Sequence, residues 1–418
     1  MINIKWNINR VLILALLSFF SCTEEFIPET ITFEDLLVVE ATITDEFKFQ
    51  EIKLSRTFSF EEQVTFESLA DLSIIDDTQN IYSFNETEPG KYISSIMFNI
   101  EPNKSYTLQI TDRNNKSYIS SPVKLPNSTS QITDVSYIMN TNFDGEEGID
   151  IVVDSFDPSG EAKFYRYEYE ETSKLIPPFW SRYDPVIVSD TPLFRVHWTL
   201  REREERICFN TKISNEIIQT SSDELSEARI TKFPIKFIEK TDPNIRDRYS
   251  ILVKQFVQSQ EAYSYFNTLN EFSNSESVFS ENQPGFIEGN IFSVDNDDKK
   301  VIGFFELASV STKRIFFNFH DVFPNDDRPF YFVRCDGPIM PLLNENLDVT
   351  ATNSATRSPL LDMLATGEYD VLEIIFPSFA PPEFLDSLVA TTPYLLVKKE
   401  CSDCTVFGSN IKPDFWID

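Results

Sequence analysis

The chain has 418 residues, with 38 Phe and 15 Tyr but only 10 Gly, so it carries enough apolar surface to bury a substantial core. This composition excludes disorder over most of the length, because burial of that surface offsets the entropy lost on folding. The formal net charge of −31 argues against nucleic acid as a partner, because an acidic surface repels phosphate backbones. The negative charge is typical of a protein that must stay soluble on a crowded cell surface. Cation binding is the alternative interpretation of this charge.

The first 21 residues have the pattern of a bacterial lipoprotein signal peptide. Lys5 and Arg10 precede an apolar run over residues 11–20, which is short for a membrane-spanning helix. The run ends at Ser21, a small residue that permits cleavage, and Cys22, whose thiol can accept a diacylglycerol. We therefore expect the mature chain to begin at Cys22 and to be anchored in a membrane, since each buried methylene contributes about 0.8 kcal/mol. An ordinary cleaved signal and an uncleaved anchor are the alternatives.

Two segments follow this predicted anchor. Residues 22–32 are expected to form an acidic tether, because they contain three glutamates and a proline and show no periodic pattern. From Phe33 onward the apolar period becomes two, as where Ile52 and Leu54 alternate with polar residues. Six or seven such runs, separated by turn residues, predict an antiparallel sandwich of immunoglobulin type over residues 33–126.

Residues 127–418 are predicted to form a second, larger domain, rich in strands and with a few short helices. The clearest helix begins at Ser259, which can cap it. Its apolar stripe is expected to lie on a sheet and consists of Ala262, Phe266, Leu269 and Phe272. Tyr263 and Tyr265 fall beside that stripe and are expected to be half exposed. Shorter helices are predicted to begin at Ser222, Ser358 and Pro381.

Residues 176–185 are predicted to be an irregular loop rich in aromatic side chains, because their prolines break both β-ladders and helices. The candidate binding residues of this loop are Phe179, Trp180, Arg182 and Tyr183. Such a loop can stack against a sugar or dock a protein. The alternative is that its aromatic side chains fold back over the domain.

Four cysteines remain after Cys22, and outside the cytoplasm such an even set usually forms disulfides. They are Cys208, Cys335, Cys401 and Cys404. We predict two disulfides, in which each member of the C-terminal Cys-x-x-Cys pair bonds to an earlier cysteine. A zinc site and a redox-active pair are the alternatives, although a redox pair requires a helix start in a βαβ setting that this tail lacks.

The sequence contains no motif of a known catalytic or cofactor site. The serine nucleophile elbow, the zinc-binding helix motif and the glycine-rich phosphate loops are all missing. The two histidines, His197 and His320, leave little for zinc or for Ser-His catalysis. The acidic stretches at residues 144–147 and 295–298 lack the pattern of a calcium loop and are predicted to be solvated turns. We therefore expect no enzymatic activity, no cofactor and no metal.

Several stretches, taken in order, resemble one protein family. They are residues 232–238, 248–255 with 261–263, 283–284 with 289–291, 313–316, and the tail at 401–404 with 412–416. In this order they are similar to the Bacteroidota lipoproteins of domain-of-unknown-function family 4249, over nearly all of the mature chain. One departure is Gly408-Ser409, where the family is expected to be richer in glycine. The resemblance implies an outer-membrane lipoprotein that serves as an accessory to a TonB-dependent receptor, and it assigns no functional residue.

We therefore expect a non-enzymatic, lipid-anchored, mainly β protein of the outer membrane that binds a ligand or partner. Glu24 and Glu25 are similar to the signal that directs some Bacteroidota lipoproteins to the cell surface, but a solvated linker has the same composition. The periplasmic face is therefore the alternative location. A TonB-dependent receptor is the expected partner, and the sequence does not identify the ligand, whether a small molecule or a glycan. A carboxylate-based surface hydrolase and a structural envelope protein are the other hypotheses.

Overall fold

The computed structural model describes residues 35–57, 65–127, 130–190, 195–274, 287–294, 300–341, 358–374 and 394–418. The predicted signal peptide, with Cys22 and the tether after it, lies outside the described residues, and so does the helix predicted at Pro381. No helix within the described ranges combines the length and the apolar composition that crossing a membrane requires.

The strands nearest the N-terminus are short, and their side chains alternate between the core and the surface. They are β1 (Leu37–Thr44), β2 (Glu51–Arg56), β3 (Thr65–Phe66), β4 (Asp71–Asp76), β5 (Ile81–Glu88), β6 (Lys91–Ser94), β7 (Ser105–Thr111), β8 (Ser117–Ser120) and β9 (Val123–Lys124). In β2, Ile52 and Leu54 are buried and Lys53 between them is exposed. This is the arrangement that the two-residue apolar period predicts.

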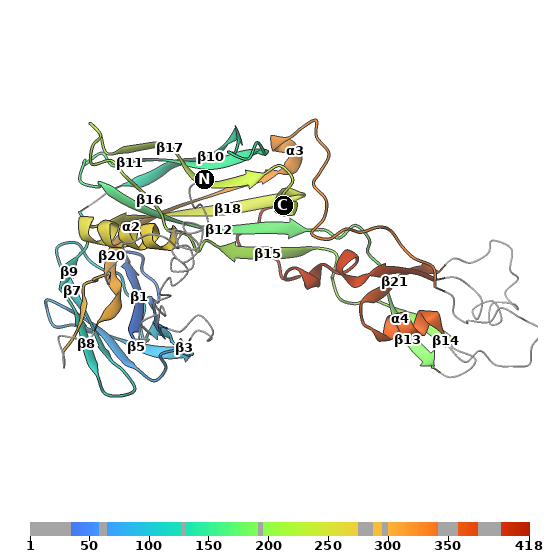
Figure 1. The fold of residues 1–418 in the computed structure, drawn as a ribbon, viewed down its shortest axis with the longest axis horizontal. Helices are drawn as coiled ribbons and strands as arrows, with labels where there is room; N and C mark the ends of the chain where they lie inside the picture. The colour runs from blue at the N-terminus through green and yellow to red at the C-terminus, as the bar shows by residue number, and fades with distance from the viewer. Residues whose placement is uncertain are drawn as a thin grey trace, which may run out of the picture.

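The next strands build a two-layer sandwich above the N-terminal strands (Figure 1). They are β10 (Gln131–Thr141), β11 (Glu147–Phe156), β12 (Phe164–Leu175), β15 (Cys208–Ile213), β16 (Ile218–Ser221), β17 (Arg229–Glu239), β18 (Arg248–Gln258) and β20 (Val301–Asn318), with short helices η1 (Pro243–Ile245) and α3 (Phe319–Val322). Strands β10, β11 and β17 form one layer, and β12, β18 and β20 contribute to the other. Side chains from both layers share one core, in which Ile151 and Tyr167 are fully buried.

Strand β20 connects the two halves of the molecule. Its residues 301–308 pair in parallel with β1, and residues 309–318 pair antiparallel with β18. Strand β19 (Ile291–Ser293) also joins the N-terminal strands, because it pairs with β8. The N-terminal core therefore includes four later residues, namely Ile291, Val301, Phe305 and Leu307. The mainly β class is confirmed, whereas the immunoglobulin-like character of residues 33–126 stays a prediction.

The remaining elements form an arm that projects from the sandwich (Figure 1). They are β13 (Tyr183–Ser189), β14 (Arg195–Leu200), α4 (Pro359–Ala365), β21 (Tyr369–Ile374), β22 (Tyr394–Lys398), η3 (Lys399–Cys401) and η4 (Cys404–Val406). Arg201, whose side chain is 2% exposed, lies 2.9 Å from Asp184, 2.7 Å from Glu205 and 3.6 Å from Asp370. This ion cluster joins the β13–β14 hairpin to β21.

The helix predictions had mixed outcomes. Helix α2 (Gln260–Asn274) begins after Ser259, whose hydroxyl accepts a hydrogen bond from Ala262 N–H at 3.2 Å. Helix α4 begins after Ser358, whose hydroxyl caps Leu361 N–H in the same way. The helix predicted at Ser222 is wrong, because Ser222 N–H donates to the Lys163 carbonyl at 2.8 Å and the chain there forms a turn. Ser, Asp and Glu favour turns as well as helix starts.

Asp76 is expected to make folding sensitive to acid. Burial raises the pKa of this carboxyl, but hydrogen bonds from the backbone and side chains of Asn80 and Thr78 outweigh burial, so the pKa lies well below 3.8. A depressed folded-state pKa stabilises the fold above about pH 4, and that contribution is lost as pH falls further. We expect Asp76→Asn to cost about 1–2 kcal/mol at pH 7. Urea midpoints at pH 7 and pH 3 should show this cost shrinking in acid, and a cost independent of pH would contradict the assignment.

Candidate functional site

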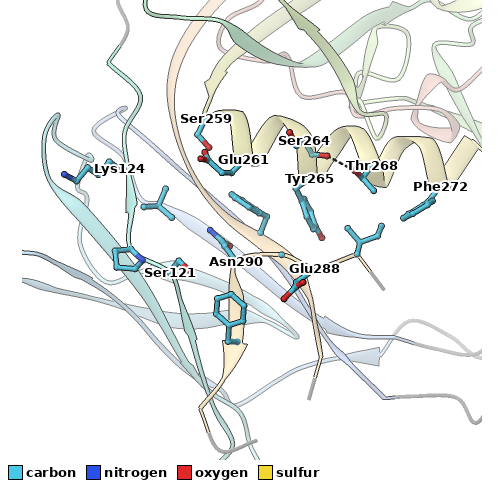
Figure 2. Close-up of a pocket in the computed structure, with 16 residues that line it drawn as sticks. Ser121, Lys124, Ser259, Glu261, Ser264, Tyr265, Thr268, Phe272, Glu288 and Asn290 are labelled. Carbon is cyan, nitrogen blue, oxygen red and sulfur yellow. Dashed lines mark hydrogen bonds between the residues drawn. The ribbon is translucent and has the colours of Figure 1, made fainter. Parts of the chain in front are cut away.

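An open pocket of about 910 Å³ lies between helix α2, the β8–β9 connection and the segment that leads into β19 (Figure 2). Its lining consists of Ser121, Pro122, Val123, Lys124, Ser259, Glu261, Ser264, Tyr265, Thr268, Phe272, Ile287, Glu288, Gly289, Asn290, Phe292 and Phe304. A pocket of this volume is in the range of small-molecule and cofactor sites. It is larger than two other hollows among the described residues, of about 400 Å³ and 180 Å³.

Helix α2 forms one wall of the pocket because its apolar side packs against β20. Ala262 is buried, and Phe266 and Leu269 are partly buried in the same cluster as Phe304, which confirms three members of the predicted stripe. The fourth member, Phe272, lies outside this cluster and lines the pocket. Tyr263 is half-buried, as predicted. The expectation for Tyr265 is wrong, because this side chain is 6% exposed and packs on Phe304 with ring centroids 5.3 Å apart. The helix contacts both β12 and β20, so it buries a wider face than the predicted stripe alone.

The floor of the pocket is a seam between β19 and β20 that side chains close. The Asn290 amide donates to the Phe305 carbonyl at 2.9 Å and accepts from Phe305 N–H at 2.7 Å. It therefore makes the two hydrogen bonds that the backbone of a neighbouring strand would make with Phe305. The Tyr265 hydroxyl accepts a hydrogen bond from Gly303 N–H, while burial raises the pKa of this tyrosine. A Cβ placed on Gly289 would lie 1.8 Å from the Gly303 carbonyl oxygen, so only glycine permits this close approach.

A side chain at Gly303 is expected to disrupt this seam. Gly303 has φ of +139°, and an added Cβ would lie 2.2 Å from the Val39 carbonyl oxygen of β1. We expect Gly303→Ala to lower the free energy of unfolding by about 2–3 kcal/mol, measured by urea unfolding. Gly145→Ala is the matched control, because Gly145 also has positive φ but has open space around it, and should cost about 1 kcal/mol. Equal costs for the two variants would show that crowding at the seam is not important.

Beneath helix α2, a buried ion cluster fixes the position of the pocket wall. Arg166 is 7% exposed and bonds Glu306 at 3.0 Å, and Gln258 donates to the same carboxylate at 2.6 Å. The guanidinium also lies 5.1 Å from the centre of the Phe266 ring on α2. A buried, paired charge holds its partners in one geometry, so this cluster sets where α2 sits.

The chemistry of the pocket suits binding. Hydroxyl groups of Ser121, Ser264 and Thr268 line the pocket together with the Asn290 amide of its floor. Its aromatic lining residues are Tyr265, Phe272, Phe292 and Phe304 (Figure 2). Glu261, Glu288 and Lys124 are exposed ionisable groups in the lining, which contains no histidine or cysteine. No group of three or more His, Cys, Asp or Glu side chains that could hold a metal ion occurs in the described part of the chain.

The aromatic loop predicted as a binding surface lies between β12 and β13, away from the pocket lining. Phe179 and Trp180 are half-buried, and Phe179 N–H donates to the Cys401 carbonyl at 3.0 Å. Arg182 is exposed, and Tyr183 begins β13. The loop is therefore fixed to the C-terminal tail, and the structure does not bring these residues together with the pocket.

The cysteines form the two predicted disulfides. Cys208 bonds Cys404 and Cys335 bonds Cys401, so each member of the C-terminal pair reaches back to an earlier cysteine. Of the two acidic stretches, residues 144–147 form an exposed hairpin turn, in which the Asn142 side chain accepts from Asp144 and Glu146 N–H. Residues 295–298 lie outside the described chain, as do Cys22 and the predicted tether.

The fold and the pocket define a mainly β protein with an open pocket on one side of a helix. A family model described as a domain of unknown function (DUF4249) matches residues 23–314. The chain belongs to this family, as the series of similar stretches along its sequence indicated. No curated protein and no solved structure matches the chain. The whole pocket lies inside the matched span, whereas the described C-terminal part of the arm lies beyond it.

Proposed function

We propose that this chain is a lipid-anchored lipoprotein of the outer membrane, and that it binds a ligand in the pocket beside α2. The observation that carries the proposal is that pocket, whose lining combines aromatic side chains with hydroxyl and amide groups, a composition typical of ligand sites. The lipoprotein signal and the family resemblance support the location. They also support the partner, a TonB-dependent receptor to which the ligand would be delivered.

The ligand we propose is amphipathic and either neutral or cationic. Glu261 and Glu288 place two carboxylates around the pocket against the single ammonium of Lys124. The formal net charge of −31 adds a long-range field that repels anions. Tyr265, Phe292 and Phe304 offer apolar faces to such a ligand. We propose no reaction at this site.

Blocking the pocket tests ligand binding. Ser264 is exposed and lines the pocket, so Ser264→Trp should fill it, whereas Asn267 is exposed on α2 outside the lining and Asn267→Trp is the matched control. Each protein is purified from gently solubilised membranes after mild crosslinking, and small molecules and partners are identified by native mass spectrometry. Wild type and Asn267→Trp should retain the same ligand, and Ser264→Trp should retain at least tenfold less. Equal retention by the blocked variant would refute the pocket as the site.

The anchor is tested separately. Mass spectrometry of the mature N-terminus should find Cys22 carrying acyl chains, and Cys22→Ala should move the protein from the membrane to the soluble fraction. An intact, unlipidated N-terminus would overturn the location and leave the pocket test unaffected.

A further inference from the structure

The two disulfides lie in different surroundings. Cys208 and Cys404 are fully buried in an apolar cluster with Leu175. In the other bridge Cys401 is 1% exposed, but Cys335 is half-buried and close to solvent. Thiol–disulfide exchange requires access to a sulfur atom. The two bridges therefore differ in the solvent access of their sulfur atoms, which affects how fast each is reduced.

A hollow of about 180 Å³ adjoins the more exposed bridge. Both of its cysteines line the hollow, together with the cationic residues Arg334 and Lys398. Arg334 is paired with Asp336, and its side chain is 89% exposed. Asp336 also lines the hollow, so the lining carries one net positive charge, from Lys398 and the Arg334–Asp336 pair. This positive charge attracts an attacking thiolate, which the net negative charge of the protein as a whole would repel.

We propose that Cys335–Cys401 is a selectively reducible bridge, opened by a dithiol protein of the cell envelope while Cys208–Cys404 stays closed. A thiolate of the reductant attacks Sγ of Cys335, the bond to Cys401 breaks, and the Cys401 sulfur leaves with the electron pair and takes up a proton. The second thiol of the reductant then attacks the mixed disulfide and releases Cys335. The bridge gains two electrons and two protons, and the dithiol becomes a disulfide.

Opening this bridge would act on one segment of the arm. The bridge ties the chain at Cys335 to η3, which directly follows β22, and the pairing of Ile339 with Leu396 holds the same segment. The tail beyond Cys401 keeps a separate attachment, because Cys404 stays bonded to Cys208 and Ser409 pairs with Phe209. Reduction therefore loosens residues 335–341 and leaves the body of the protein intact.

The test is timed reduction of the folded mature protein with dithiothreitol at pH 8, followed by alkylation and peptide mass spectrometry. Cys335 and Cys401 should be alkylated at least tenfold faster than Cys208 and Cys404. The same reaction in guanidinium chloride is the control, where the rates should converge. Similar rates in the folded protein, or faster reaction of Cys208–Cys404, would overturn the proposal.

Two further measurements test the mechanism. Arg334→Glu combined with Lys398→Glu should slow the first reduction step at least threefold, because the attacking thiolate then meets negative charge. Hydrogen exchange after partial reduction should increase in residues 335–341 and remain unchanged around Ser409. An unchanged rate in the charge-reversed variant, or exchange spreading through the sandwich, would contradict the route through this hollow.

Discussion

Replacing Arg56 by leucine is expected to lower the free energy of unfolding by about 3–5 kcal/mol. The Arg56 side chain is 6% exposed and donates to Glu67 at 2.6 Å and to Asp112 at 2.8 Å, and both of these carboxylates are fully buried. Removal of the guanidinium leaves the buried carboxylates of Glu67 and Asp112 without the cationic partner that they share. Urea unfolding followed by circular dichroism measures the loss, because none of the tryptophans lies in the N-terminal strands.

The pH dependence of this loss identifies its cause. Burial raises the pKa of Asp112, but hydrogen bonds from Lys116 N–H, Arg56 and Asn114 N–H outweigh burial. The pKa of Asp112 therefore lies below 3.8 in the wild type. Without Arg56 the buried Asp112 carboxyl becomes easier to protonate, so the loss should be smaller at pH 5 than at pH 7. Lys53→Leu is the control, since Lys53 pairs with Glu51 on the surface of the same strand and should change stability by less than about 1 kcal/mol. Similar losses for both variants would refute the role of the buried cluster.

Removal of the buried disulfide is the second change with a large expected effect. Cys208 and Cys404 are 196 residues apart, and Cys208→Ala with Cys404→Ala should lower the free energy of unfolding by about 3–5 kcal/mol. The physical reason is that the bridge restricts the unfolded chain, and longer closed loops restrict it more. Trp416 packs on Phe209 next to this bridge, so tryptophan fluorescence during urea unfolding reports the effect.

The second disulfide supplies the comparison. Cys335 and Cys401 close a loop of 66 residues, so their double alanine variant should lose about 1 kcal/mol less. A loss below about 1 kcal/mol for the Cys208–Cys404 variant, or the reverse order of the two variants, would contradict the chain-entropy explanation.

Local patterns predicted much of the secondary structure. The alternation of Ile52 and Leu54 with polar residues predicted β2, and the capping serines Ser259 and Ser358 predicted the starts of α2 and α4. These signals lie within a few neighbouring residues, so the sequence displays them directly. The helix expected at Ser222 failed because the same polar residues also form turns, and pairing with Lys163 favoured the turn.

Contacts between distant segments could not be predicted in this way. The pocket takes its walls from residues 121–124, from α2 and from residues 287–292, and nothing local marks these segments as neighbours. Tyr265 is buried because Gly303 and Phe304 approach it from a strand that follows it in the chain. The pairing of Cys335 with Cys401 likewise depended on the folded arm, so the sequence left the connectivity open.

The parallel pairing of β1 with β20 has a consequence for biosynthesis. Thr42 and Glu306, which are hydrogen-bonded across this pair, are 264 residues apart in the sequence. At ribosomal rates of about 5–20 residues per second, roughly 15–50 seconds separate their appearance. During that interval the nascent N-terminal strands have both edges uncovered, because β8 also pairs with a later strand, β19. A holding chaperone is one means of keeping these edges from aggregating.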